Sequence, residues 1–422
     1  MPSNSEKLFR RISLVSAIFL IACVSFVYGV QVFRAHYWPY KALSVFVEHG
    51  KNYLKYGVWA PKNLIVNAPE NAAREVILFT DKNAAMDGYR AILIWDFQRS
   101  QHAVPLLNSE GEEVHRWWFR FDTLAPTNFG AGKSHPLIIL NDGSIVIGLE
   151  SILLARIDAC SQAVWVKRGG YHHSLAWDDD GSLWIWRGEV SHANLYQFMQ
   201  KFDPLTGDTL QELSLVDDFI KTSPELERIF RLPPNFDFWH HGEGPEFDAF
   251  HANDVEPLPS ALLDQYPGFA AGDLLVSLRN INLVAIFDPL GKKIRWWMHG
   301  PWIRQHDPDF GVNGRITIFN NNPGRFSSNI VSVNPQDNTV DFFAVDEASL
   351  FYAEEMGKHQ VLPNGNLFIT VPGEGRVLEV SPQGKTVFEY NNVFSATANG
   401  RVSNARWLPT DYFKTMPHCS QQ

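Results

Sequence analysis

Imidazole side chains stand where the sequence predicts that β-strands begin. His172 and His173 open the segment YHHSLAW, and His306 in RQHDPDF comes just before another predicted strand. A neutral imidazole is a nucleophile near neutral pH, where it also exchanges protons. A single histidine beside a strand is usually structural, but the repeated position makes these residues candidates for nucleophilic or acid–base chemistry.

Two further segments carry groups that bind anions. His251 and Asn253 in FHAND lie two residues apart and are therefore expected on the same side of a strand. Arg279 in VSLRN lies on an otherwise apolar predicted strand. Its planar guanidinium matches the oxygens of sulfate or phosphate. If these segments meet, their cationic and imidazole groups form an anion site.

The elements that position these residues belong to an internal repeat. Each copy is an alternating apolar strand, a polar turn and a second strand that often ends in Trp or Phe. Four of the five intervals between copies are about 46 to 48 residues, near the period of a four-stranded propeller blade. The six copies begin at Leu106, Leu154, Gln200, Val284, Ile330 and Val377.

A second repeated element lies between copies of the first. In it an Asp-Gly or Asn-Gly turn precedes an alternating strand, which is typical of a β-hairpin because Gly accepts a positive φ. Two hairpins per period make one blade, so the sequence predicts an all-β, six-bladed β-propeller. The innermost strands of a propeller line its axis, where side chains from different blades can meet. Copies of this element begin at Leu140, Trp177, Val312 and Leu362.

The longest interval between repeats, about 84 residues from Gln200 to Val284, contains an insertion of about 36 residues. We expect this insertion at about 215–250. Its sequence does not alternate and contains helix-compatible stretches. Insertions in repeat folds lie on one face, often the face that binds ligands.

The N-terminal residues depart from the β pattern. Residues 12–33 carry no charge and are long enough to cross a membrane as a helix. Basic residues within 1–11 predict a cytoplasmic N-terminus, 34–65 are expected to form a juxtamembrane linker with a short helix, and 66–422 the propeller. A cleaved signal peptide is the alternative, but the long apolar run without an A-x-A-like site favours an uncleaved signal anchor. We expect the inner (cytoplasmic) membrane, with the propeller in the periplasm or another extracytoplasmic space.

Charge and cysteines limit the partners. The formal net charge of −10 and the pI near 5.8 give no electrostatic basis for binding nucleic acid. Cys23 lies within the predicted membrane helix. Cys160 and Cys419 could form a disulfide in an oxidising compartment, and two free thiols fit equally well. The sequence has no cysteine spacing of the zinc-binding type, and we expect neither a metal nor a cofactor.

Four motifs, taken in order, resemble the arylsulfotransferase family. The members of this family are six-bladed propellers that transfer a sulfuryl group from one phenol to another without a nucleotide sulfate donor. The resemblance implies an aryl-sulfate sulfotransferase whose partners are small-molecule aryl sulfates and phenols, and it extends over about Leu106–Tyr390. The motifs are HANDVE at 251–256, VSLR at 276–279, QHD at 305–307 and FNNNPGR at 319–325.

The resemblance implies a role for each matching residue. His306 would be the nucleophile that is transiently sulfated, giving a sulfohistidine. His251 and Asn253 would hold the sulfuryl oxygens, and His251 would also be placed to pass a proton to the phenolic oxygen. Arg279 would neutralise the charge that develops on the sulfuryl oxygens.

Two further assignments depend on register and on departures from the family. His173 best matches the family's earlier active-site histidine, with His172 as the alternative. Asn321 would bind substrate, although the run Asn320-Asn321-Asn322 replaces the family's usual Asp-Asn-Gly and lacks its carboxylate.

Two other classes of protein remain open from the sequence. A catalytically inactive, membrane-anchored propeller would bind an anionic ligand or a protein partner as a scaffold. A quinone-cofactor dehydrogenase propeller shares Trp-rich blades but has a more regular Trp-based repeat. A pure scaffold would not need His306 together with Arg279 and His251, so this combination favours sulfuryl transfer.

Overall fold

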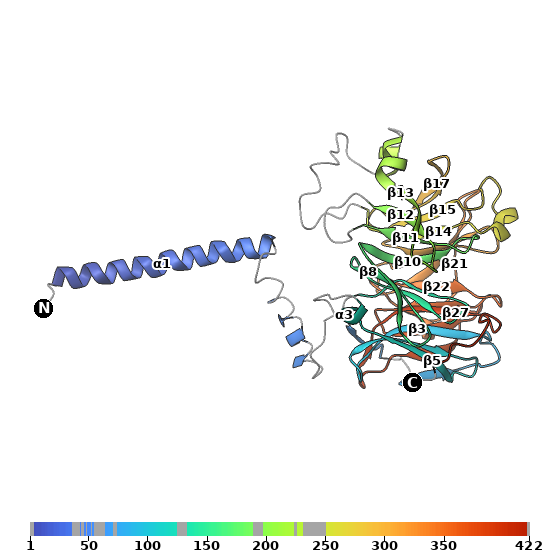
Figure 1. Cartoon of the computed structure of the whole chain (residues 1–422), viewed down its shortest axis with the longest axis horizontal. Helices are drawn as coiled ribbons and strands as arrows, with labels where there is room; N and C mark the ends of the chain where they lie inside the picture. Colours follow the sequence, from blue (N-terminus) through green and yellow to red (C-terminus); the bar gives the residue numbers. More distant parts are fainter. Residues whose placement is uncertain are drawn as a thin grey trace. The chain divides into compact units, whose positions relative to one another are not determined.

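The computed structural model describes residues 4–35, 64–70, 74–124, 133–188, 197–222, 226–230 and 250–419, together with single positions between 43 and 54. The chain divides into two compact units, Met1–Lys62 and Asn63–Gln422. The second unit contains the β-sheets and the candidate site, and the first contains a long helix (Figure 1).

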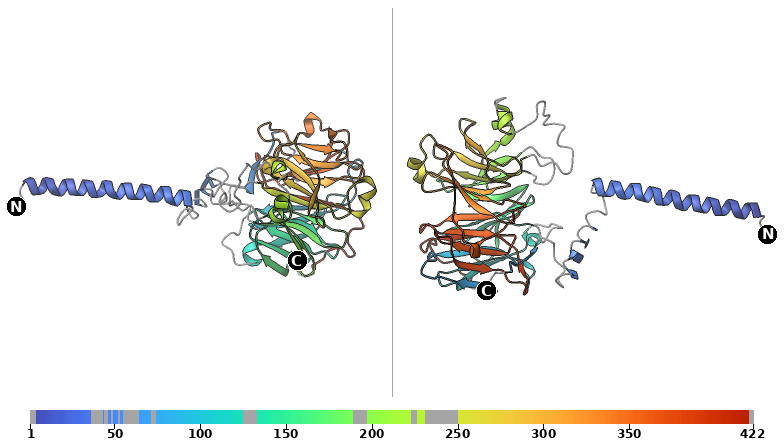
Figure 2. Two further views of the ribbon diagram at one scale, coloured as in Figure 1. Left: turned by 90° about the horizontal axis from the view of Figure 1, so that it is seen from above. Right: turned by 180° about the vertical axis from the view of Figure 1, so that it is seen from behind.

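In the described residues, six antiparallel sheets, five of four strands and one of five, surround a common axis and are here called blades 1 to 6 (Figures 1 and 2). In blades 2 to 6 the strands run in chain order from the axis outward. In Figure 1 the labels lead inward from β13 to β10 in one blade and from β5 to β27 in another. The predicted all-β, six-bladed propeller is confirmed.

The strands of the blades are given from the axis outward. Blade 1 has β27 (Val402–Leu408), β3 (Tyr89–Asp96), β4 (Gln101–Leu107) and β5 (Glu113–Phe119), and blade 2 has β6 (Leu137–Ile139), β7 (Ile145–Leu149), β8 (Leu153–Ile157) and β9 (Ala163–Arg168). Blade 3 has β10 (Tyr171–Trp177), β11 (Leu183–Arg187), β12 (Phe198–Phe202) and β13 (Thr209–Ser214), and blade 4 has β14 (Ala252–Pro257), β15 (Leu274–Leu278), β16 (Leu283–Asp288) and β17 (Lys293–His299). Blade 5 has β18 (His306–Phe310), β19 (Ile316–Asn320), β20 (Asn329–Val333) and β21 (Val340–Phe342), and blade 6 has β22 (Lys358–Val361), β23 (Leu367–Val371), β24 (Arg376–Val380) and β25 (Thr386–Asn391).

Short elements complete the second unit. β2 (Ile77–Phe79) adds a fifth strand to the outer edge of blade 6, and β1 (Ile65–Asn67) pairs with β26 (Ala398–Gly400). The short helices are α3 (Phe121–Leu124), α4 (Leu226–Ile229), η2 (Leu215–Phe219), η3 (Ile220–Thr222), η4 (Ser260–Gln265), η5 (Arg279–Ile281) and η6 (Glu347–Ser349).

The two repeated sequence elements are the two hairpins of a blade. The copy that begins at Leu140 leads through the turn into β7, and the copy that begins at Leu154 covers β8 and β9. Gly143 has a φ of 83° in the first of these turns, a value that Gly adopts without steric cost. Local turn chemistry therefore sets the hairpins of each blade.

Blade 1 closes the ring by joining the two ends of the propeller unit. Its inner strand β27 comes from the C-terminal end and pairs with β3, so that Val402 lies opposite Ile94. Closing the ring removes sheet edges that would otherwise be open to other chains. The tail after β27 is linked to the outer turn of blade 2 by a disulfide between Cys160 and Cys419, whose Cα atoms lie 5.0 Å apart. The sequence left open either a disulfide or two free thiols, and the structure contains the disulfide.

The core lies between neighbouring blades. Both faces of the inner sheets are buried, as in β7, where all five residues are inaccessible to solvent. One large cluster joins blades 3 and 4 through side chains such as Trp186, Val276 and Phe287. Phe219 and Phe230, from the start of the expected insertion, pack into the same cluster. Residues 223–225 and 231–249 of the insertion lie outside the described part of the chain.

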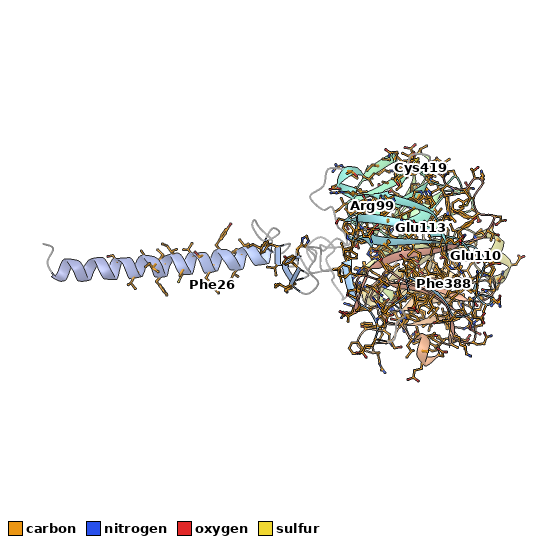
Figure 3. All side chains as sticks on the ribbon, turned by 90° about the horizontal axis from the view of Figure 1, so that it is seen from below. Phe26, Arg99, Glu110, Glu113, Phe388 and Cys419 are labelled. Atoms are coloured by element: carbon orange, nitrogen blue, oxygen red, sulfur yellow. A yellow bond between two sulfur atoms is a disulfide. The ribbon has the colours of Figure 1, made fainter. Side chains whose placement is uncertain are left out.

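The first unit contains helix α1 (Asn4–Ala35). Its segment Val15–Val32 has a mean hydropathy of 2.2, and by length and composition it could cross a membrane. Most of its described side chains are exposed, among them Phe26 at 73% (Figure 3). The helix includes the predicted apolar run and is compatible with membrane anchoring. Most of the predicted linker at 34–65 lies outside the described residues.

Candidate functional site

The inner strands of blades 3, 4 and 5 share an irregular start. A β-bulge shifts the register within β10, β14 and β18. One non-glycine residue at each start has a positive φ: 62° at His173, 48° at His251 and 50° at Asp307. Such angles are uncommon outside glycine, and bulges change the direction of side chains. These strand starts therefore do not follow the alternation of a regular strand.

A cavity of about 340 Å³ lies at the end of the axis where the inner strands begin. We call it the histidine cavity, because four imidazoles lie in its wall beside cationic and acidic side chains. Its lining consists of Lys133, His135, Glu150, Ser151, His173, His251, Arg279, His306, Glu355 and Met356.

His173 is central among the imidazoles of this cavity. Its ring centroid lies 5.1 Å from that of His251, 5.4 Å from that of His135 and 6.4 Å from that of His306. These histidines come from blades 2, 3, 4 and 5, and more than 50 residues separate His251 from His306 in the chain. The ring of blades brings them within reach of one small ligand.

His306 is held by Asn321, which lies just after β19. The amide nitrogen of Asn321 donates to the carbonyls of Ala353 at 2.8 Å and Met356 at 2.7 Å. Its Oδ1 must therefore accept, and it lies 2.7 Å from Nδ1 of His306. The hydrogen of the neutral ring is thus on Nδ1, and Nε2 carries the lone pair.

Burial and charge keep this imidazole neutral. His306 is 4% exposed. Burial, followed by the positive charge of Arg279, lowers the pKa of His306 to about 3, although the bond to Asn321 acts in the opposite direction. At neutral pH the ring is uncharged, which is the form in which a histidine nitrogen attacks an electrophile.

A second hydrogen-bond chain sets the tautomer of His173. Nε2 of His172 lies 2.8 Å from Oε1 of Gln197, so the hydrogen of neutral His172 is on Nε2. Nδ1 of His172 lies 2.8 Å from Nδ1 of His173 and therefore accepts from it. The lone pair of His173 is left on Nε2. Burial and the neighbouring histidines lower the pKa of His173 well below its ordinary value.

The structure places the six residues expected in the site at two depths. His173, His251, His306 and Arg279 line the cavity, whereas Asn253 and Asn321 are buried behind it. His172 also lies outside the lining. Of the two registers considered, the structure therefore puts His173 in the cavity.

Asn253 does not share a side of the strand with His251, contrary to the expected alternation. The bulge in β14 shifts the register between Ala252 and Asp254, and His251 precedes the strand. The amide of Asn253 donates to the carbonyl of Gln305 at 2.8 Å, next to His306. Asn253 thus contacts the backbone that carries His306.

The sequence predicted Arg279 on a strand, and this prediction is wrong. β15 ends at Leu278, and Arg279 begins η5. It comes from blade 4, the same blade as His251, and its backbone nitrogen donates to the His251 carbonyl at 3.1 Å. Its Nε lies 3.2 Å from Oδ1 of Asn280. The backbones of two of the residues expected at the sulfuryl oxygens, His251 and Arg279, are thereby joined.

Four titratable residues of the cavity were missed from the sequence: Lys133, His135, Glu150 and Glu355. His135 stands just before the inner strand of blade 2, the same position that singled out the other histidines. Lys133 and Arg401 pair with Glu355 at 3.1 and 3.4 Å. Although burial alone would raise the pKa of Glu355, these two cations lower it to about 2.

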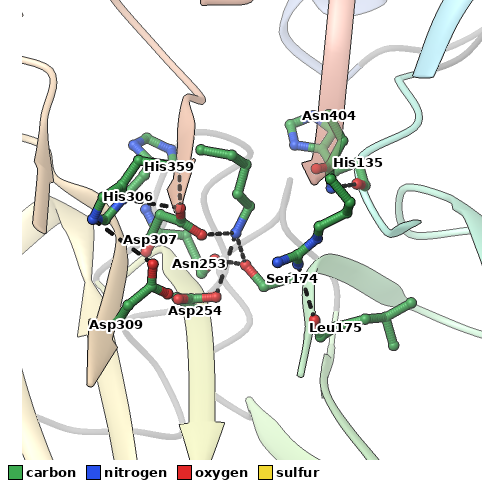
Figure 4. A network of polar contacts seen from close by, with 12 residues as sticks. His135, Ser174, Leu175, Asn253, Asp254, His306, Asp307, Asp309, His359 and Asn404 are labelled. Atoms are coloured by element: carbon green, nitrogen blue, oxygen red, sulfur yellow. Dashed lines mark hydrogen bonds and ion pairs between the residues drawn. The ribbon is translucent and has the colours of Figure 1, made fainter. Parts of the chain in front are cut away.

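A buried ionic network lies further along the axis (Figure 4). The ammonium of Lys358 contacts Asp307 at 2.5 Å and Asp254 at 3.5 Å, and it also bonds Ser174. His359 contacts the other oxygen of Asp307 at 3.2 Å. Although burial would raise the pKa of Asp307, Lys358 and His359 together lower it. The network fixes the residue that follows His306.

A second cavity of about 340 Å³, the acidic cavity, lies beyond this network and is lined by Asp254, Glu256, Asp307 and Asp309 among others. Burial raises the pKa of Glu256 to about 8 and that of Asp309 well above its ordinary value. Among the described residues, Asp307, Asp309 and His359 have ligand atoms close enough for a metal ion. Lys358 already pairs with Asp307, so a cation there would have to compete with it for that carboxylate.

Fold and site together define a class: a six-bladed propeller whose axial cavity combines neutral imidazoles with fixed cations. A family profile described as "Arylsulfotransferase (ASST)" matches residues 136–393, which is more than half of the chain and includes His173, His251 and His306 but not His135. The chain belongs to the arylsulfotransferase family. No curated protein matches it.

Solved structures with a similar fold are distant in sequence. A protein of unknown function from Bacteroides caccae has 12% identity and a TM-score of 0.48, over 75% of this chain and 99% of its own. TolB from Acinetobacter baumannii has 10% identity and a TM-score of 0.48, over 78% of this chain and 69% of its own.

Proposed function

We propose that this protein transfers a sulfuryl group from an aryl sulfate to a phenolic acceptor through a sulfated His306. The observation that carries the proposal is the bond between Nδ1 of His306 and Asn321, which leaves Nε2 of a neutral, cavity-lining imidazole for attack. Membership of the arylsulfotransferase family supports the same reaction class.

The proposed reaction has two halves. Nε2 of His306 attacks sulfur, so that an N–S bond forms while the bond from sulfur to the aryl oxygen breaks. The acceptor's oxygen then attacks the same sulfur and the N–S bond breaks, which restores His306. A covalent intermediate divides one difficult transfer into two easier steps.

Arg279 and His251 are proposed to bind the sulfuryl oxygens. Both line the cavity with His306. Fixed donors that face developing charge in a buried site need no reorganisation during the reaction, which makes them effective catalysts. Asn253 and Asn321 are proposed to position His306 from behind. The cavity volume of about 340 Å³ is near the lower end for small-molecule sites and favours a donor with one aromatic ring.

The propeller is proposed to work outside the cytoplasm, with α1 as an uncleaved signal anchor in the inner membrane. The disulfide between Cys160 and Cys419 supports this location, since disulfides persist mainly in oxidising compartments. The apolar helix α1 supports attachment to a membrane.

The test uses the full chain in detergent, 4-nitrophenyl sulfate as donor and phenol as acceptor. We expect nitrophenol release that depends on phenol, and a covalent SO₃ adduct when phenol is left out. His306→Ala should lose both, whereas His418→Ala, a change of an exposed histidine, should keep both. An active His306→Ala variant would refute the nucleophile, and binding without turnover over a panel of phenols would favour a scaffold.

A further inference from the structure

A carboxylate without an assigned role, Glu150, faces two imidazoles of the histidine cavity. It follows β7 in blade 2 as Arg279 follows β15 in blade 4. One carboxylate oxygen lies 3.5 Å from Nε2 of His135, and the other lies 3.9 Å from Nε2 of His173. The Glu150 side chain is 16% exposed, so little water screens these contacts.

The contact between Glu150 and His173 lacks a proton in the neutral cavity. The hydrogen-bond chain from Gln197 through His172 leaves a lone pair on Nε2 of His173. This lone pair and a carboxylate oxygen repel one another. A proton on Nε2 would turn the same contact into an ion pair between imidazolium and carboxylate. Glu150 and His173 can therefore share a proton when a negative charge in the cavity favours protonation of His173.

An anionic ligand changes that charge balance. Without one, burial and then the neighbouring histidines lower the pKa of His173 and so oppose its protonation. A bound aryl sulfate brings a negative charge next to the ring, which favours the imidazolium form. The titratable and charged groups around His173 and Glu150 are Lys133, His135, His172, His251, Arg279, His306, Glu355, Lys358 and Arg401.

We propose that Glu150 is a positioning residue that holds a proton on His173 when the donor is bound, so that His173 serves as the acid and base of the transfer. This inference rests on the proposed sulfuryl transfer. It gives His173 the proton transfer that family resemblance had given His251, and it leaves His251 to the sulfuryl oxygens.

The proton balances over the two halves of the reaction. When His306 attacks sulfur, the electron pair of the breaking bond goes to the aryl oxygen, which takes the proton from Nε2 of His173 and leaves as the phenol. The acceptor's O–H then returns a proton to Nε2 of His173 as its oxygen bonds to sulfur. The electron pair of the N–S bond returns to His306.

The kinetic test compares donors whose leaving groups differ in basicity. A basic phenolate needs a proton as it leaves, whereas nitrophenolate leaves readily without one. Glu150→Gln should lower kcat/KM for phenyl sulfate by about 100-fold and for 4-nitrophenyl sulfate by less than about tenfold. Glu150→Asp should recover part of the loss, and Glu354→Gln, a change of an exposed carboxylate, should behave as the wild type. An equal loss with both donors would overturn the proposal, because it indicates a structural role.

A second readout needs no turnover. The full chain labelled with ¹³C at histidine Cε1 is titrated with and without inorganic sulfate, and the His173 signal is identified by its loss in His173→Asn. Sulfate should move the His173 titration upward by at least one pH unit in the wild type and much less in Glu150→Gln. An equal movement in both proteins, or none in the wild type, would refute the proton-holding pair. If the wild type shows the expected movement but no sulfotransferase activity, the proposed sulfuryl transfer is refuted and the proton-holding pair is not.

Discussion

The disulfide between Cys160 and Cys419 should stabilise the propeller against unfolding. It joins residues 259 positions apart, so it closes a very long loop in the unfolded chain. The loop-entropy relation gives about 5.6 kcal/mol at 25 °C for a loop of this length, and measured values are commonly lower, about 2 to 4 kcal/mol. We expect Cys160→Ala/Cys419→Ala to lower the free energy of unfolding by about 2 to 5 kcal/mol.

The position of the disulfide predicts which part of the propeller is destabilised first when the disulfide is removed. Cys419 ends the tail that follows β27, the inner strand that closes the ring by pairing with β3. Loosening the tail should therefore raise hydrogen exchange first in β27. Guanidinium unfolding of the full chain in detergent gives the free energy, and Cys23→Ala, which removes the free cysteine of α1, is the matched control. A double variant as stable as this control, within about 0.5 kcal/mol, would refute the reasoning.

Three substitutions test the residues that hold His306 in place and set its pKa. Asn321→Ala releases the Nδ1 contact of 2.7 Å and should lower kcat by about 100-fold or more with little change in donor KM, measured by nitrophenol release. Arg279→Gln removes a charge that disfavours the imidazolium, so the His306 pKa should rise above about 3 and the acidic limb of the pH–rate profile should move to higher pH. Asp307→Asn leaves buried Lys358 with less compensation and should cost about 3 to 5 kcal/mol of stability in denaturant unfolding.

Repeated local signals explain how much of the fold could be predicted. Turns such as the one at Gly143 and the alternating strands beside them are written in short stretches of sequence, so hairpins and blades follow from them. The closure of blade 1 has no such signal, because the pairing of Val402 with Ile94 joins residues about 300 positions apart. The same holds for Cys160 and Cys419, whose pairing depends on a Cα separation that the sequence does not contain.

The sequence predicted which residues belong to the candidate site better than it predicted how they are arranged. His173, His251 and His306 share a position at the start of an inner strand, and this shared position identified them. Asn253 was expected beside His251 because strands alternate, and the bulge in β14 breaks that alternation. Glu150 carried no signal at all, since a single carboxylate after a strand is ordinary. Its significance comes from two imidazoles that reach it from other positions in the chain.

The charge of the histidine cavity favours transfer over permanent binding of an anion. Protonated histidines would hold a sulfate tightly, but a protonated His306 could not attack it. Burial lowers the pKa of His135, His173 and His306. Two carboxylates, Glu150 and Glu355, offset part of the positive charge of the cations. In the proposed transfer, binding energy then falls mainly on the charge that develops as the S–O bond breaks, and interactions that strengthen in the transition state are the ones that raise the rate. A reversible sulfuryl carrier requires a neutral His306, which a scaffold for anions does not need.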